Sequence, residues 1–291
     1  MLNSAIFFVM LISAILGSSP AFSSGKTDLC SDRKPPVHLL ENVQLKALFT
    51  YCPKLADVSI GRDSTHNLFA GQWYDRKKPT FGFYSQTAEG LNIDLGGSVS
   101  TVNMSSRKGM LPLLPGSSGF YIEFLARIDS DSMDHWPALW LNPIEHNAKE
   151  DDRSFSYRRR YQHWMELDVD EGGFQSGMFG TVIEWQGNYP NYQKTQNKHP
   201  AAKDLDRTTF HTFSAYYDPV NGFVTWWMDG VLHNKAPAPE IGSKYNYYVT
   251  MGAQSHGKNE SYKLIVKRVR AFVPMLLDTK RLKQSRKQCQ L

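Results

Sequence analysis

The amino-acid sequence predicts an all-β fold, an antiparallel sandwich of two sheets, and two observations support this prediction. From residue 69 onward, short runs rich in Val, Ile, Phe, Tyr and Trp alternate with turn-forming pairs such as Asn221-Gly222 and Asp229-Gly230. Long helical periodicity is missing from this region, so helices do not separate the strands as they would in an α/β fold.

The expected elements follow in order along the chain. A continuous apolar run at 5–17, followed by small residues at Ala21 and Ser23, is typical of a signal peptide over 1–23 that is cleaved on export. The segment 24–79 has an unclear role; it packs on or leads into the main domain of 80–277, and its pattern predicts one short helix around 39–49. Strands are expected at 81–85, 91–95, 120–128, 138–141, 165–169, 180–185, 211–217, 223–228, 247–254 and 264–272.

Charge and cysteine content limit the partners and the compartment. The C-terminal tail of 278–291 carries a net charge of +4 of the formal +5 of the 291 residues, so the rest of the chain is near neutral. A solvated tail is the preferred interpretation, and the sequence predicts no nucleic-acid partner, no membrane span in the mature chain and a monomer. An exported chain can keep disulfides; Cys30 with Cys52 would close a short loop, but the sequence does not choose among pairings that include Cys289.

The stretch 166–171, ELDVDE, places four carboxylates in six residues. On a regular strand Glu166 and Asp168 share one face, while the apolar residues between them share the other. A β-bulge at 169–170 would return Glu171 to the face of Glu166 and align three carboxyls. Such alignment suits glycoside hydrolysis, in which a retaining enzyme uses two carboxyls about 5 Å apart, and crowding raises the pKa of one so that it stays protonated.

Two other interpretations of these carboxylates are a calcium site and a solvated acidic edge. Calcium prefers several oxygens from a loop, whereas the apolar alternation here predicts a strand. No metal or other cofactor is therefore expected. A structural calcium ion is possible, but the sequence does not indicate one. A solvated edge accounts for Asp170 but not for three inward carboxyls beside Trp164. The pattern therefore favours catalysis.

The surrounding motifs resemble glycoside hydrolase family 16, in the form of its laminarinase-, agarase- and carrageenase-like members with a bulged E-x-D-x-x-E signature. ELDVDE matches that signature, and it is preceded by GFYIEFLARID and HWPALWLNP and followed by FHTFSAYYDPVNGFVTWWMDGVLHN and KRVRAFVP. These segments occur in the order of the family's motifs over about 80–274. The resemblance implies a concanavalin-like β-jelly roll with a concave cleft for a polysaccharide.

Carried over by position, the resemblance implies that Glu166 is the nucleophile, Asp168 its partner and Glu171 the general acid and base. Trp136 and Trp140 match the tryptophans of the family's W-P-A-x-W motif, where sugars bind. Three further residues, Trp164, Trp185 and Arg160, are also expected to contact substrate.

The chain departs from the family pattern at two places. Ile183 stands where many members have a histidine, which removes a polar contact near the cleft. The arginines at 158–160 suit a sulfated or acidic polysaccharide. The preferred interpretation, however, is that the acidic residues at 150–152 neutralise these arginines in a surface network. Trp73 and Trp226, with Trp227, are assigned to the core, and His211 to a structural hydrogen bond.

Other chemistries lack their motifs. The sequence contains no G-x-S-x-G elbow, no Walker loop, no dinucleotide fingerprint and no zinc-type spacing of His or Cys. The sequence thus predicts an exported, endo-acting, retaining β-glycan hydrolase, with β-1,3-glucan as the default substrate ahead of galactans. Two alternatives remain: a glycan-binding module without activity, and a transglycosylase that uses the same carboxyls.

Overall fold

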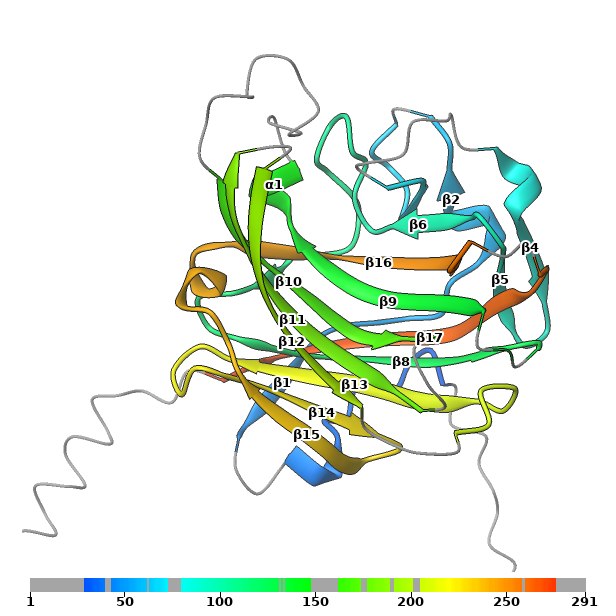
Figure 1. Cartoon of the computed structure of the whole chain (residues 1–291). Helices are drawn as coiled ribbons and strands as arrows, with labels where there is room; N and C mark the ends of the chain where they lie inside the picture. Colours follow the sequence, from blue (N-terminus) through cyan, green and yellow to red (C-terminus); the bar gives the residue numbers. More distant parts are fainter. Residues whose placement is uncertain are drawn as a thin grey trace, which may run out of the picture.

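The computed structural model describes residues 29–39, 43–61, 63–72, 80–130, 132, 134–147, 162–173, 177–188, 191–200, 205–257 and 260–275. The signal peptide, the basic tail with Cys289, Trp73 and the arginines at 158–160 lie outside these residues. Within the described part, strands form two sheets that pack face to face (Figure 1). The predicted antiparallel sandwich is therefore confirmed.

The larger sheet carries the acidic stretch on β10, the third strand from one of its edges. Its described strands are antiparallel except for the short β2–β3 pair. In spatial order they are β12 (Asn191–Pro200), β11 (Phe179–Asn188), β10 (Gln162–Glu171), β9 (His135–Pro143), β16 (Asn246–Ser255), β6 (Ser98–Ser100), β3 (Leu68–Ala70) and β2 (Val58–Ser59), with β7 (Leu114–Pro115) paired to β16.

The second sheet packs beneath the first. Its central strands β8 and β17 are long and pair with each other through a register shift between Val266 and Arg268. In spatial order the described strands are β15 (Val231–Pro237), β14 (Phe223–Met228), β13 (His211–Asp218), β8 (Phe120–Ile128), β17 (Lys263–Pro274), β5 (Gly90–Asp94) and β4 (Tyr84–Thr87), with β1 (Leu45–Tyr51) also paired to β17.

Helical structure in the described ranges is limited to single turns. The α-helix α1 (Ile144–Asn147) follows β9 directly. The 3-10 turns are η1 (Val37–Leu39), η2 (Leu55–Asp57), η3 (Phe81–Phe83) and η5 (Glu240–Lys244).

The core between the sheets follows from strand alternation. Leu167 and Val169 of β10, predicted to share the face opposite Glu166 and Asp168, are fully buried, and they share one cluster with Ile122 and Phe124 of β8 and with Trp226 of β14. Burying such side chains removes large apolar areas from water, at about 25 cal/mol for each Å². The other face of the larger sheet is thus left for polar side chains, and the carboxyls of Glu166, Asp168 and Glu171 lie there.

The helix predicted around 39–49 is wrong. Residues 45–51 form β1, which pairs antiparallel with β17, and among the described residues of 39–49 helical geometry is limited to Leu39, the end of η1; residues 40–42 lie outside the described ranges. The sequence there has apolar residues at helical spacing, but Leu45 and Phe49 also fit a strand with one face buried. Strand β5 pairs only with residues 263–266 of β17, so residues 269–274 offer β1 a ladder of backbone hydrogen bonds on that side, and this tertiary contact overrides the local preference.

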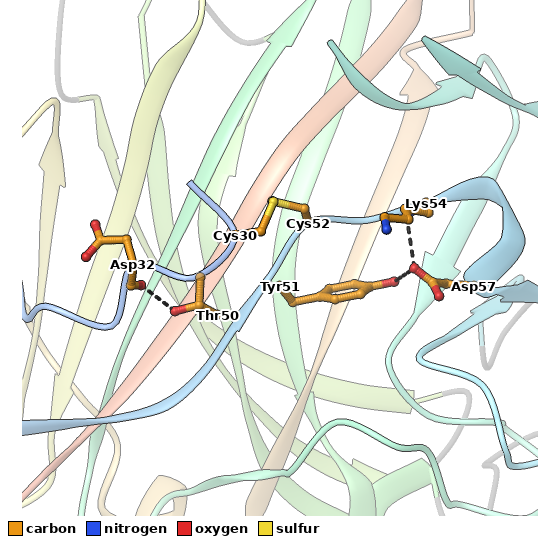
Figure 2. Close-up of a disulfide and its surroundings, with 7 residues drawn as sticks. All are labelled: Cys30, Asp32, Thr50, Tyr51, Cys52, Lys54 and Asp57. Atoms are coloured by element: carbon orange, nitrogen blue, oxygen red, sulfur yellow. Dashed lines mark hydrogen bonds between the residues drawn. A yellow bond between two sulfur atoms is a disulfide. The ribbon is translucent and has the colours of Figure 1, made fainter. Parts of the chain in front are cut away.

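A disulfide fixes the chain before β1 to the chain after it. Cys30 and Cys52 are bonded, with Cα atoms 5.5 Å apart (Figure 2). Next to the bond, the Thr50 hydroxyl donates to the Asp32 carbonyl at 2.6 Å. The residues of 30–39 thereby lie over the outer face of the second sheet, where Arg270 contacts Asp32 at 2.7 Å.

Candidate active site

The acidic strand β10 contains the predicted bulge. Across from β9, Asp168 pairs with Trp140, whereas Asp170 pairs with the next residue back, Leu139. Val169 is therefore the extra residue on the bulged strand. Every residue after it lies on the face opposite to the one that regular alternation would give.

As a result, three carboxyls share one face; we call Glu166, Asp168 and Glu171 the carboxyl trio. Thr181 of β11 pairs with Asp168, and its hydroxyl donates to Glu171 Oε2 at 3.1 Å. The charge of Glu171 raises the pKa of both Glu166 and Asp168. The three side chains are thus close enough to influence one another's protonation.

Asp170 lies on the other face, toward the core. It is 1% exposed, and its carboxylate accepts two hydrogen bonds from Arg207, at 2.6 and 2.9 Å, and one from the Phe179 backbone N–H at 3.2 Å. The interpretation of Asp170 as a solvated edge residue is therefore wrong. The bulge that aligns the trio turns this side chain inward, and a buried carboxylate requires a charged partner.

The two glutamates of the trio are held by uncharged donors. The Trp136 indole Nε1 donates to Glu171 Oε1 at 3.1 Å, and the Thr181 hydroxyl donates to the other oxygen. The Trp185 indole Nε1 donates to Glu166 Oε2 at 2.9 Å. Each donor fixes a rotamer of its carboxyl without neutralising the charge that the group carries when ionised.

All three pKa values of the trio lie above those of ordinary carboxyls. Burial, with Glu171 nearby, raises the pKa of Glu166 to about 8. Burial and both neighbouring glutamates raise the pKa of Asp168 well above its usual value. Burial also raises the pKa of Glu171, although the bonds from Thr181 and Trp136 oppose the rise. At neutral pH the trio therefore retains protons that exposed carboxyls would release.

The predicted tryptophans lie near the trio but differ in exposure. Trp136 and Trp185 are partly exposed, and each is stacked on another ring. The ring centroids of Trp136 and His256 are 4.6 Å apart, and those of Trp185 and Trp164 are 5.5 Å apart. Trp140 and Trp164 are 6% and 3% exposed. Trp136 and Trp185 thus offer ring surface to a ligand, whereas the sugar contacts predicted for the other two stay predictions.

Other residues singled out from the sequence have clear positions. Ile183 pairs with Glu166 and is 5% exposed, so an apolar side chain does stand beside this carboxyl. His211 has the structural place expected of it, since its ring nitrogens contact Asp229 at 2.7 Å and Thr209 at 2.8 Å. Arg160 lies outside the described residues, and its contact with substrate stays a prediction.

Sequence reasoning missed several residues of the site. Thr181 had a usable signal, because alternation along FGTVIEW places it on the same face as Ile183 and Trp185. Arg207 had none, since the position of its guanidinium depends on how a loop 37 residues away in sequence folds back. His256 likewise comes from a distant loop after β16.

A cavity of about 900 Å³ is lined by residues at the ends of strands from both sheets. Gln254, the register partner of Trp136, and Ser98 contribute to its lining, together with Phe83 and Tyr262 from the opposite side. No member of the trio lines it. The carboxyls of the trio are therefore not part of this cavity.

Comparison with solved structures identifies the fold. The endo-1,3-beta-glucanase of Streptomyces sioyaensis superposes with a TM-score of 0.52 at 14% identity, over 83% of this chain and 99% of that one. The chain shares the fold of that glucanase. The β-jelly roll expected from the resemblance to glycoside hydrolase family 16 is thus confirmed.

Two further solved structures show weaker similarity. A family 16 enzyme of a Bacteroides ovatus mixed-linkage glucan locus, in complex with a product, has a TM-score of 0.46 at 13% identity, over 76% of this chain and 93% of that one. The beta-porphyranase of Bacteroides plebeius has a TM-score of 0.44 at 13% identity, over 67% and 80%. No protein-family model matches the sequence, and no curated protein matches it.

Proposed function

We propose that the chain is an exported, endo-acting glycosidase that cleaves β-linked polysaccharide with retention of anomeric configuration. One observation carries the proposal: Glu166, Asp168 and Glu171 share a face of β10 and have raised pKa values, and the two glutamates receive hydrogen bonds from uncharged donors rather than from arginine. A carboxylate that only stabilises the fold needs none of these features. The arrangement supplies an acid, a nucleophile and a group between them.

In the first step the ionised form of Glu166 attacks the anomeric carbon, and the bond from that carbon to the leaving oxygen breaks. Because the pKa of Glu166 is raised to about 8, this form is the minority at neutral pH and increases as the pH rises. Glu171 transfers its proton to the leaving oxygen, so the departing sugar is a neutral alcohol. The raised pKa of Glu171 favours this role, because the group must still hold its proton near neutral pH. The product is a glycosyl ester of Glu166.

In the second step water attacks the same carbon and the ester bond to Glu166 breaks. Glu171, now ionised, takes the proton from the water and returns to its starting state. Asp168 lies between the two glutamates, and its strongly raised pKa favours the neutral form, which limits charge repulsion while Glu166 is ionised. We assign it a positioning role.

The partly exposed indoles suit the sugars on either side of the scissile bond. Each donates through its N–H to a glutamate and presents ring surface, as a pyranose with an apolar face requires. Trp136 belongs to the Glu171 side and Trp185 to the Glu166 side. A β-1,3-glucan is the default substrate, with galactans next, and Arg160 is retained as a proposed contact.

Export is supported by the Cys30–Cys52 disulfide and by the apolar run at 5–17. In the described ranges no helix is long and apolar enough to cross a membrane. A transglycosylase would differ only in the second step, where a sugar hydroxyl replaces water. A binding module would retain the aromatic contacts without turnover.

The test is reducing-sugar release from laminarin, mixed-linkage glucan, agarose and carrageenan by the wild type, Glu166→Gln and Glu171→Gln. Each variant is expected to abolish turnover while folding is retained, because each lacks a group that exchanges a proton or forms the ester. Glu184→Gln is the matched control, since the side chain of Glu184 on β11 faces away from the trio. Its Oε1 lies 2.5 Å from His163 Nε2. Near wild-type rates in either trio variant would refute the roles.

Product analysis separates the remaining alternatives. If the configuration is retained, NMR should show that the first-formed product is the β anomer. Azide added to an acid/base variant such as Glu171→Ala should yield a glycosyl azide. Products longer than the substrate indicate transglycosylation. Binding of a glycan by the wild type without any cleavage would assign the chain to the binding modules.

A further inference from the structure

The edge strand β12 places cationic side chains along the face of the trio. Lys194 pairs with Trp185 and Lys198 pairs with Thr181, and both of these partners on β11 donate hydrogen bonds to the trio. Since paired residues share a face, the two lysines lie on that face too. Both lysine side chains are exposed.

The lysines are within electrostatic reach of the carboxyls. The charge of Lys194 lowers the pKa of Glu166, and that of Lys198 lowers the pKa of Asp168 and Glu171. Lys194 Nζ also lies 5.4 Å from the centroid of the Trp185 ring. A cation therefore stands beside the indole on which the proposed function places a sugar.

Neutralising the trio is not a sufficient explanation for Lys194. For Glu166, burial and Glu171 outweigh the lysine, and the pKa remains raised. Where this protein neutralises a buried carboxylate, it uses arginine in direct hydrogen bonds of 2.6 to 3.1 Å, as at Asp170 and Glu123. An exposed ammonium group, screened by salt, is poorly suited to that purpose.

Protection of the sheet edge is not sufficient either. Lysines on an edge strand discourage pairing with another chain whichever face they occupy. On β12 the residues that alternate with the lysines, Gln193, Thr195 and Asn197, are uncharged. Both positive charges of the strand are thus on the face of the trio.

We propose that Lys194 recognises an anionic substituent, a sulfate ester or a carboxylate, on the sugar that lies against Trp185. This inference rests on the proposed glycosidase function and replaces its default substrate, the neutral β-1,3-glucan, by an anionic polysaccharide such as a sulfated galactan or a uronate-containing glycan. The Cα atoms of Lys194 and Lys198, four residues apart on the strand, are about 13 Å apart. We assign Lys198 to a second charged group further along the glycan.

The test uses matched pairs of substrates that differ only in charge. A sulfated galactan is compared with its desulfated form, and a uronate-containing glycan with its carboxyl-reduced form, for the wild type, Lys194→Gln and Lys198→Gln. For one of the two pairs, Lys194→Gln should lower the ratio of kcat/KM on the charged form to that on the neutral form by about tenfold. The pair that responds identifies the anion as sulfate or carboxylate.

The ratio separates recognition from an effect on the trio. If Lys194 only tunes Glu166, the variant shifts the pH profile and lowers kcat/KM on charged and neutral forms equally, and the proposal is overturned. A wild type that cleaves the neutral form as well as the charged one overturns it too. Lys46→Gln, at an exposed position of β1 in the other sheet, is the control for general charge loss.

Binding measures the proposal independently of turnover. In affinity electrophoresis, a gel containing the charged glycan should retard the full chain, and Lys194→Gln should remove most of the retardation. This result would stand even if no glycan were cleaved, in which case only the proposed glycosidase activity would fail. Absence of retardation by both the sulfated and the uronate glycan would overturn the anionic recognition.

Discussion

Asp170 and Glu171 are neighbours in the sequence and both are buried, yet their surroundings are opposite. Asp170 is 1% exposed and bonded to a guanidinium, while Glu171 is 8% exposed and bonded to an indole and a hydroxyl. Arg207 is the ion-pair partner of the first. The second has no arginine at hydrogen-bond distance among the described residues, and burial raises its pKa.

This difference separates a carboxylate that stabilises the fold from one that is available for chemistry. An arginine at hydrogen-bond distance holds a carboxylate ionised and removes it from proton transfer. A carboxyl held by neutral donors keeps its position and can exchange a proton near neutral pH. The two kinds should therefore respond in opposite ways to substitution and to pH.

The largest expected effect is at the structural carboxylate. Asp170→Ala leaves Arg207 buried without its partner, which should destabilise the fold by about 3–5 kcal/mol. Urea unfolding followed by fluorescence measures the loss. In the double variant Asp170→Leu, Arg207→Met both charges are gone, so most of the stability should return. A single variant within about 1 kcal/mol of the wild type would remove the distinction drawn here.

The substitution Asp168→Asn should stabilise the fold rather than destabilise it, and the size of this effect should depend on pH. The folded-state pKa of Asp168 is raised, so its contribution to stability is fully present below the unfolded value of about 3.9 and is lost as pH increases. Asparagine does not titrate, so the variant should melt at a higher temperature than the wild type at pH 8, by about 2–4 °C for each kcal/mol. At pH 4 the difference should vanish. A difference in melting temperature that is constant from pH 4 to 8 would contradict the raised pKa.

Removing the two indole N–H donors should shift different limbs of the pH profile of kcat/KM. Trp136→Phe deletes a bond that lowers the pKa of Glu171, so the basic limb of kcat/KM should move to higher pH, with a loss of about 2- to 10-fold. Trp185→Phe raises the pKa of Glu166 and should move the acidic limb to higher pH instead. If Trp136→Phe moved the acidic limb, the two glutamates would have exchanged roles.

The smallest effect is expected at a carboxylate that has an arginine but is partly solvated. Asp32 contacts Arg270 at 2.7 Å, its side chain is 30% exposed, and it lies next to the disulfide (Figure 2). Asp32→Asn should reduce stability by about 0.5–1 kcal/mol, measured by thermal unfolding in low salt. The loss should shrink at high salt. A loss of stability near that of Asp170→Ala would mean that the contribution of these ion pairs to stability does not depend on how deeply they are buried.

Much of the fold was predictable from local patterns. The strands β8 and β14 have the bounds expected from their apolar alternation and their turns. Strand β12 was missed because NYQKTQNKHP has almost no apolar residues, and it becomes a strand only because β11 pairs with it. Likewise β1 depends on the edge of β17, which no local pattern reveals.

The carboxyl trio was predictable because the bulge, the alternation and the family resemblance all pointed to the same side chains. The partners of those side chains were not predictable to the same degree. The bond from Trp136 to Glu171 spans 35 residues and that from Trp185 to Glu166 spans 19, so each depends on the register of two strands. Arg207 reaches Asp170 from a loop, and composition alone suggested a solvated side chain there.

Val169 is an extra residue that the strand could lose without turning the trio to another face. Deleting it would restore regular alternation, with Asp170 in the inward place of Val169 and Glu171 still on the face of Glu166 and Asp168. Strands of two different lengths can therefore present the same three carboxyls, and the bulge changes where Glu171 stands along the strand rather than which face it occupies.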